Sequence, residues 1–342
     1  MVTRGVSRER LLALVSSFQG RRLVVAGDYV LDRFIYGHPK RVSREAPVLI
    51  LRFWKEESLP GGAGNTAANV ASLGAVPVPV GAVGDDDWGR MLIRILRERG
   101  VDTTHILTVP GYTTPTKTRI LGGGPHSIKQ QIVRYDREDQ LPKSDDIRGA
   151  IQRHLREAGS GAQGAILSDY GYGSMWAGAP GILRPALAAR APVLVDSRHG
   201  LSGFAGVDAV TPNEEELEEV AGQPFGDSVD ALGAAAESLM NAIGCPIVLV
   251  TRGSRGMALF ERGAETPTLI PVHGTDQVAD VTGAGDTVLA TFSLALASEA
   301  TPLEAAHLAN FAGGVVVMKM GTAVLTPDEL RDAIASDRAI LP

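Results

Sequence analysis

Residues 280–286 read Asp-Val-Thr-Gly-Ala-Gly-Asp, and an apolar run, residues 287–296, follows directly. Glycines on both sides of Ala284 predict a loop that turns into a helix, where backbone N–H groups and the positive end of the helix dipole favour a bound anion. Asp286 falls in the first helical turn, within reach of the proton of a nucleophile that attacks this anion. The stretch therefore indicates phosphoryl transfer to an alcohol, or else no more than an ordinary helix start.

The composition of the whole chain narrows the class of protein. Its 342 residues are 44% apolar, enough for one large α/β domain or two smaller ones. A net charge of -6 with interspersed acids and bases provides no basic surface for nucleic acid. The apolar run at residues 11–15 is too short for a membrane anchor, and a single cysteine, Cys245, beside an apolar run indicates a reducing compartment. We expect a cytoplasmic protein that binds a small molecule.

The first predicted strand, residues 23–26, ends in Gly27 and Asp28, and Asp32 follows four residues later. If residues 28–32 form a turn of helix, this spacing places both carboxylates on one face. That face lies at the edge where open parallel sheets bind ligands. Two acids together favour a hydroxyl-rich ligand, whereas Asp28 alone is equally typical of a helix cap.

A second glycine-rich stretch, residues 60–74, contains Gly62 shortly before Asn65. Small residues that run into a helix let a ligand approach the backbone, and the Asn65 amide both donates and accepts hydrogen bonds, as sugar hydroxyls require. Tight helix packing through small residues explains the same pattern.

Two stretches of β-prone residues, 33–57 and 113–135, interrupt the βα pattern. Together they predict a small sheet that covers a site or pairs two subunits, or else an exposed hairpin without function.

Downstream, short apolar runs alternate with helical patterns, which indicates βαβ units and a largely parallel sheet. Polar side chains follow four runs, 164–167, 192–195, 207–211 and 247–251. Because the carboxyl ends of parallel strands share one edge, these side chains predict a common cleft. They are Ser168 and Asp169, Asp196 with Ser197 and Arg198, Asn213 with Glu216, and Thr251, which begins a loop that contains Gly253 and Gly256.

Familiar nucleotide-binding loops can be checked directly. No Gly-Lys dipeptide occurs, which excludes a Walker A loop, and no Gly-x-Gly-x-x-Gly follows the first strand, which argues against a Rossmann oxidoreductase. Asn213 and Glu216 suit a hydrated Mg2+ with phosphate, and the glycine loop at 253–256 suits a base or phosphate. An acidic cleft binds polyphosphate only with a cation, so a metal is implied.

Taken together, the segments at 61–65, 213–216, 251–256 and 280–286 resemble those of the ribokinase-like, PfkB-type sugar kinases, in the same order. The resemblance covers about residues 20–330. It implies an α/β protein in which residues 1–342 form one ribokinase-like domain, with three α/β/α layers and a mainly parallel central sheet. The insertions at about 33–57 and 113–135 would be a small β-sheet lid, which in this family often builds a homodimer.

The same resemblance implies roles for individual residues. Asp286 would be the base that takes the proton of the acceptor hydroxyl, and Gly283, Ala284 and Gly285 would be the anion hole for the γ-phosphoryl group of ATP. Asp280 and Thr282 stand where family members hold a monovalent cation such as K+. The remaining residues are Asp28, Asp32, Gly62, Asn65 and Arg198 for the sugar, Asn213, Glu216, Thr251, Gly253, Gly256 and Asn310 for ATP, and Glu216 for Mg2+, indirectly.

A narrower resemblance is to the kinase domain of ADP-heptose synthesis enzymes, carried by residues 27–37, 41–48, 167–170 and 314–322. Those enzymes phosphorylate the anomeric hydroxyl of D-glycero-β-D-manno-heptose 7-phosphate. We do not expect the nucleotidyltransferase domain that is fused to some of them within these 342 residues.

Two positions depart from that narrower pattern. Tyr172 stands where a lysine is expected, and Ser197-Arg198 stands where Pro-Lys is expected. A basic residue pairs with a sugar phosphate, so the departures either signal a different sugar or are compensated by other arginines. The candidates are Arg198, Arg41, Arg44, Arg119 and Arg134.

Three other functions stay open at this point. The first is a kinase for another sugar, such as a ketohexose, pentose or nucleoside. The second is a non-catalytic sugar-binding regulator. A third, the NAD-linked oxidoreductase, predicts nicotinamide binding, which we do not expect.

Overall fold

The computed structural model describes residues 6–124, 129–274 and 279–337. The helices are α1 (Arg8–Ser17), α2 (Ala63–Ser72), α3 (Asp87–Glu98), α4 (Asp145–Gly159), α5 (Ala179–Leu183), α6 (Glu214–Ala221), α7 (Val229–Ile243), α8 (Ala284–Ala297), α9 (Pro302–Val316) and α10 (Pro327–Ser336). The strands are β1 (Arg22–Val42), β2 (Leu49–Gly62), β3 (Val76–Gly84), β4 (Ile106–Val109), β5 (Thr116–Gly122), β6 (Gln130–Arg137), β7 (Gly164–Asp169), β8 (Val193–Ser197), β9 (Ala209–Val210), β10 (Ile247–Thr251), β11 (Met257–Glu261) and β12 (Thr268–Ile270).

The main sheet has the strand order β12-β11-β10-β9-β8-β7-β1-β3-β4. Its pairs from β10 to β4 are parallel, and the pairs β10–β11 and β11–β12 at one edge are antiparallel. Helices connect the parallel strands, as the alternating sequence pattern predicts. The predicted run at 207–211 contributes only the two residues of β9.

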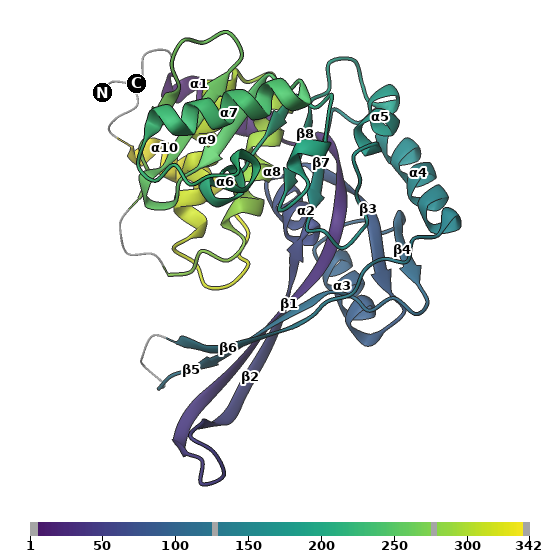
Figure 1. The fold of residues 1–342 in the computed structure, drawn as a ribbon, viewed down its shortest axis with the longest axis vertical. Helices are drawn as coiled ribbons and strands as arrows, with labels where there is room; N and C mark the ends of the chain where they lie inside the picture. The colour runs from purple at the N-terminus through teal and green to yellow at the C-terminus, as the bar shows by residue number, and fades with distance from the viewer. Residues whose placement is uncertain (1–5, 125–128, 275–278, 338–342) are drawn as a thin grey trace.

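Helices cover both faces of the main sheet (Figure 1). Neighbouring residues of β1 point to opposite faces, so Leu23 and Val25 belong to one buried cluster and Val24 and Ala26 to the other. Helices α1, α2, α8, α9 and α10 pack on the first cluster, and α4, α5 and α7 on the second. This confirms the predicted α/β/α layers with a mainly parallel central sheet.

Strand β1 is much longer than the sequence predicts, and it belongs to two sheets. Its first residues pair with β3 and β7 in the main sheet, and from Leu31 onward it pairs with β2 on one side and β5 on the other. The predicted helical turn at residues 28–32 is therefore wrong, because pairing on both sides keeps this backbone extended.

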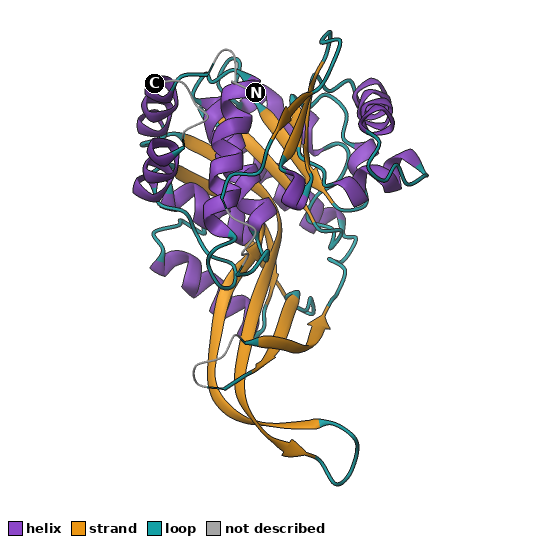
Figure 2. Ribbon diagram, turned by 90° about the vertical axis from the view of Figure 1, so that its left-hand side faces the viewer, coloured by secondary structure: helices purple, strands orange, loops and turns teal. Residues whose placement is uncertain are grey.

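The second sheet, in the order β2-β1-β5-β6, projects from the body of the protein (Figure 2). It contains most of the two β-prone stretches, although residues 125–128 of the second stretch lie outside the described part of the chain. We call these four strands the small sheet. Phe34, Tyr36 and Leu121 form its own apolar cluster.

Three smaller features complete the fold. Asp86, in the acidic triplet 85–87, accepts a hydrogen bond from the Gly89 N–H at 2.7 Å and so caps α3, as an ordinary helix start does. Cys245 is buried beside β10. Within the three described ranges, no helix has both the length and the apolar character needed to cross a membrane.

Candidate active site

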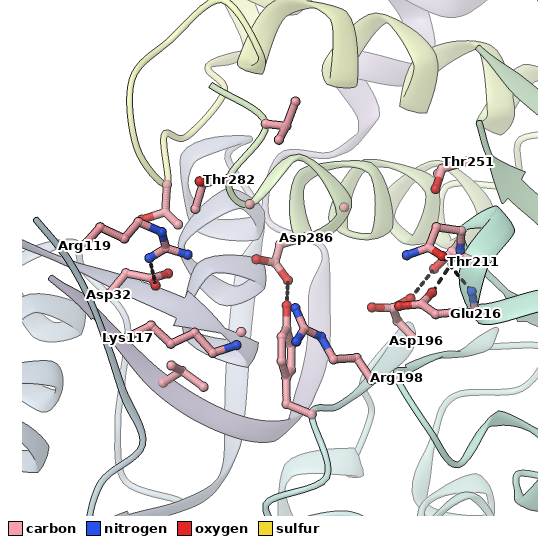
Figure 3. Close-up of a pocket in the computed structure, with 18 residues that line it drawn as sticks. Asp32, Lys117, Arg119, Asp196, Arg198, Thr211, Glu216, Thr251, Thr282 and Asp286 are labelled. Atoms are coloured by element: carbon pink, nitrogen blue, oxygen red, sulfur yellow. Dashed lines mark hydrogen bonds and ion pairs between the residues drawn. The ribbon is translucent and has the colours of Figure 1, made fainter. Parts of the chain in front are cut away.

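Several of the polar strand ends converge on a cavity of about 300 Å3 (Figure 3), whereas Ser168, Asp169 and Ser197 do not line it. Asp32 reaches it from β1, Lys117 and Arg119 from β5, Asp196 from β8, and Asp286 from the first turn of α8. Segments separated by more than 200 residues thus line one space, and Asp286 lies between a basic end and an acidic end.

Asp286 is buried and held by side chains from three elements. Its Oδ2 accepts a hydrogen bond from Asn65 Nδ2 at 2.9 Å, and its Oδ1 accepts one from the Tyr170 hydroxyl at 3.0 Å. Thr66 Oγ1 lies 3.5 Å from Oδ1. Burial raises the pKa of Asp286 to about 6, and the bonds from Asn65 and Tyr170 oppose that rise. The carboxylate is therefore ionised at neutral pH with a pKa suited to a general base.

The turn before α8 requires glycine at position 283. Gly283 is the N-cap residue with φ +77°, and a Cβ there would lie 2.5 Å from Asn65 Nδ2. The Asp280 carboxylate fixes the turn by accepting N–H groups of Thr282 at 2.9 Å and Gly321 at 3.0 Å. These contacts aim the helix N-terminus at the cavity, where an anion is stabilised.

Three cationic side chains line the cavity: Lys117 and Arg119 form its basic end, and Arg198 lies between them and the acidic end. Arg119 Nη1 lies 2.5 Å from Asp32 Oδ1, so this pair is a buried ion pair. Lys117 and Arg198 lie over the Tyr170 ring, 4.9 and 5.0 Å from its centroid. Burial, and then the charge of Arg198, lower the pKa of Lys117. Only one of the three cations has a carboxylate as its described partner, so this end suits a bound anion.

The acidic end is built by Asp196 and Glu216. Burial, and then the negative charge of Glu216, raise the pKa of Asp196, and burial raises the pKa of Glu216. Asn213 and Glu216 form a capping box at α6, because the Asn213 side chain accepts the Glu216 N–H at 2.8 Å and Glu216 Oε2 accepts the Asn213 N–H at 2.9 Å. Two carboxylates that face one space, with only oxygen atoms as donors, fit a hard divalent cation such as Mg2+.

A second cavity of about 530 Å3 adjoins the first and is mainly apolar. Thr251, Val281 and Gly285 line both cavities, so the anion site lies between them. Gly253, Gly256 and Asn310 line the second cavity, and their role in binding a nucleotide stays a prediction. Asn310 donates from Nδ2 to the Pro271 carbonyl at 2.8 Å.

Two predicted sugar ligands have other contacts. The Asp28 carboxylate accepts the backbone N–H groups of Tyr170, Tyr172 and Ser174 at 2.9 to 3.0 Å. It therefore holds the loop after β7, and it does not line the cavity. Asn65 likewise lies outside the lining, and its amide holds Asp286 instead.

The structure adds residues that the sequence patterns did not select. The main ones are Lys117 and Tyr170, which both line the cavity. Lys117 could not be selected from the sequence, because it lies on β5 of the small sheet and reaches the site only through the pairing of β1 with β5. Tyr172, which stands where a lysine is expected, donates its hydroxyl to Glu138 Oε1 at 2.6 Å and does not line the cavity.

Comparison with known sequences gives one family over most of the chain. The model of the pfkB family carbohydrate kinases matches residues 22–329. The Bifunctional protein HldE of Mesorhizobium japonicum is 42% identical over 331 residues, which are 96% of this chain and 65% of that protein. The protein of the same name from Paramagnetospirillum magneticum is 41% identical over 322 residues, 94% of this chain and 64% of its own length. The chain spans just under two thirds of these relatives.

Solved structures with the same fold include a ribokinase and a phosphofructokinase. Arabidopsis thaliana ribokinase, complexed with ribose and ATP, has a TM-score of 0.71 at 22% identity, and covers 93% of this chain and 100% of its own. Phosphofructokinase-2 from Escherichia coli in complex with potassium has a TM-score of 0.73 at 20% identity, and covers 93% and 98%. These likenesses confirm the predicted ribokinase-like fold.

Proposed function

Because the chain belongs to the pfkB family of carbohydrate kinases, we propose that it transfers the γ-phosphoryl group of ATP to a hydroxyl of a sugar phosphate. The substrate we propose is D-glycero-β-D-manno-heptose 7-phosphate, phosphorylated at its anomeric hydroxyl. One observation carries the proposal: the buried Asp286 lies at the N-terminus of α8, between a basic cavity end and an apolar second cavity.

The geometry supports ATP binding in one cavity and sugar binding in the other. ATP would occupy the apolar cavity with its γ-phosphoryl group at the N–H groups of residues 283–285, between the cavities. Asp286 would take the proton of the sugar hydroxyl as that oxygen attacks the phosphorus atom. Asn65 and Tyr170 keep the carboxylate in place, and a protein catalyses such a transfer mainly by positioning the reactants and stabilising charge.

The basic end is the feature that favours a phosphorylated sugar over a neutral one. Lys117, Arg119 and Arg198 replace the charge that Tyr172 does not supply. Lys117 and Arg119 lie across the cavity from the acidic end, and Arg198 lies between the two ends. A kinase for ribose or a nucleoside has no phosphate to place there. The second candidate function is a kinase for another sugar phosphate, because the basic end would bind the phosphate group of that sugar equally well.

The direct test is a coupled ADP-release assay with ATP, Mg2+ and a panel of acceptors. We expect kcat/KM to be highest for heptose 7-phosphate, and at least about tenfold lower for the dephosphorylated heptose, because one charge-assisted contact is worth that much. Equal or higher kcat/KM with fructose, ribose or adenosine would refute the sugar phosphate assignment.

We propose that Asp196 and Glu216 hold Mg2+, Glu216 through water, and that the ion offsets the charge of the ATP phosphates. Glu216→Gln keeps the capping box, because a glutamine oxygen also accepts the Asn213 N–H. We expect it to raise the Mg2+ concentration that gives half-maximal activity by about tenfold. Glu215→Gln, at an exposed position on the same helix, is the matched control and should leave the Mg2+ titration unchanged.

A K+ site is proposed at Asp280 and Thr282. The fit rests on the turn that they form with Gly321, which is held by a carboxylate beside the anion site. Exchange of K+ for Na+ in the same assay measures whether activity depends on it.

The pKa of Asp286 predicts the acid limb of the pH–rate profile. Burial raises the pKa of Asp286 to about 6, and a general base is active when it is deprotonated. Activity is therefore present above pH 6 and is lost as the pH falls through that value. We expect kcat/KM to fall about tenfold per pH unit below pH 6. A profile that stays flat down to pH 5 would contradict the assignment of Asp286 as the base.

A homodimer through the small sheet is proposed from its exposed apolar surface. Phe53 is 65% exposed and Tyr135 55% exposed, and other large apolar side chains of β2 and β6 are also exposed. A patch of this kind is typical of an interface. Light scattering of the purified chain, with twice the mass of one chain expected, tests this directly.

A further inference from the structure

A group of side chains with metal-ligand chemistry lies apart from both cavities, between α4 and the loop that precedes β4. His154 and Glu157 are three residues apart on α4 and so project from the same side of the helix. His105 comes directly before β4, the edge strand of the main sheet. One ligand atom from each of the three residues lies within 4.8 Å of the others. Figure 1 shows α4 and β4 on the same side of the molecule.

The hydrogen bond made by His154 leaves its second ring nitrogen available. His154 Nδ1 lies 3.0 Å from the backbone carbonyl oxygen of His105, which can only accept, so Nδ1 carries the proton. Nε2 then has a free lone pair. A ring N–H that donates to a backbone carbonyl is the usual second contact of a histidine that ligates a metal.

His105 adds a nitrogen that has no hydrogen bond. Its Nδ1 is buried without a hydrogen-bond partner among the described residues, and it lies 3.6 Å from Glu157 Oε2, beyond hydrogen-bond range. A buried nitrogen without a partner costs free energy. A cation between His105 and Glu157 would give both of them a partner.

The neighbouring acid does not complete the group. Asp102 is not among the residues whose ligand atoms lie within 4.8 Å of one another, and its Oδ1 accepts the backbone N–H of Thr104 at 2.9 Å and the Thr104 hydroxyl at 2.6 Å. The donor set is therefore two imidazoles and one carboxylate. This set suits Zn2+, whereas Mg2+ prefers oxygen donors throughout.

We propose that His105, His154 and Glu157 bind Zn2+, with water as the fourth ligand. Zinc–nitrogen bonds of about 2.0 Å require the ligands to come closer together than 4.8 Å. The Glu157 side chain can make that adjustment, because 59% of it is exposed. The ion links helix α4 to the edge of the main sheet, so it stabilises this part of the fold and takes no part in phosphoryl transfer.

The test is a calorimetric titration of the full chain with Zn2+ after removal of metals by a chelator. His154→Gln and Glu157→Gln each remove one ligand, and the exposed Glu157→Gln carries little risk to folding. His199→Gln is the matched control, because His199 and Glu219 are an exposed pair, 3.4 Å apart, that belongs to no group of three ligands among the described residues. Co2+ in place of Zn2+ gives a second readout, since its visible absorption reports a tetrahedral site with nitrogen ligands.

We expect one Zn2+ per chain at micromolar or tighter affinity, at least about tenfold weaker in both ligand variants and unchanged in His199→Gln. The melting temperature should rise with Zn2+ in the wild type and in His199→Gln only. Binding that is equal in the wild type and in both ligand variants, or binding weaker than about 1 mM, would overturn the proposal.

Discussion

Asp286→Asn is expected to lower kcat for sugar phosphorylation by about 10² to 10⁴-fold, the usual contribution of a general base, with little change in the KM for ATP. Asparagine has the shape of the aspartate but cannot take a proton from the attacking hydroxyl. The protein should remain folded. The amide oxygen can still accept from Asn65, and the Tyr170 hydroxyl can accept from the new NH2 group because a hydroxyl both donates and accepts.

The measurement is ADP release under saturating sugar phosphate and ATP, with thermal melting of the same sample to establish folding. Asp87→Asn is the matched control. It also changes an aspartate in the first turn of a helix, α3, but the Asp87 side chain is 89% exposed. Full activity is expected for it. Retention of wild-type kcat within about threefold in Asp286→Asn would exclude the carboxylate as the base.

Gly283→Ala is expected to lower kcat by about 10²-fold and to destabilise the fold by about 1 kcal/mol or more. Two effects add. A residue with a side chain is strained at φ +77°, and the new Cβ would lie 2.5 Å from Asn65 Nδ2. Asn65 must then move, and it is the residue that holds Asp286 Oδ2. A displacement of the base by about 1 Å is sufficient for a loss of that size.

Gly100→Ala is the control that separates backbone strain at a positive φ from the clash with Asn65. Gly100 has φ +75°, close to that of Gly283, but nothing lies within 4 Å of its added Cβ. This control should show the strain as a lower melting temperature and keep wild-type kcat. If both variants lose stability equally and neither loses activity, the contact between position 283 and Asn65 has no part in positioning Asp286.

The site could be predicted in part because some of its chemistry is local. A glycine-rich turn before a helix needs a positive φ and exposes N–H groups, so residues 283–286 are recognisable without any tertiary contact. The capping box of Asn213 and Glu216 is local in the same way. Polar strand ends could be assigned to one cleft because a parallel sheet aligns them.

The errors have a common physical origin in pairing between distant segments. Residues 27–28 have the composition of a βα turn, but β1 continues through them. They pair with β3 and β7, and from Leu31 onward the strand pairs with β2 and β5, so pairing on both sides overrides the local preference. Lys117 enters the site by the same pairing. The hydrogen bond from Asn65 to Asp286 could not be predicted for the same reason, because the two residues are distant in the sequence; sugar binding by Asn65 stays a prediction.

The hydrogen bond between Asn65 and Asp286 joins residues that are 221 positions apart. Contacts of such separation are slow to form, because the intervening chain must first be ordered. During synthesis, the strands of the small sheet are complete by residue 137, whereas α8 begins only at residue 284. Enzymatic activity therefore reports the last stage of folding, and during refolding it should return after the β-sheet signal in circular dichroism has already recovered.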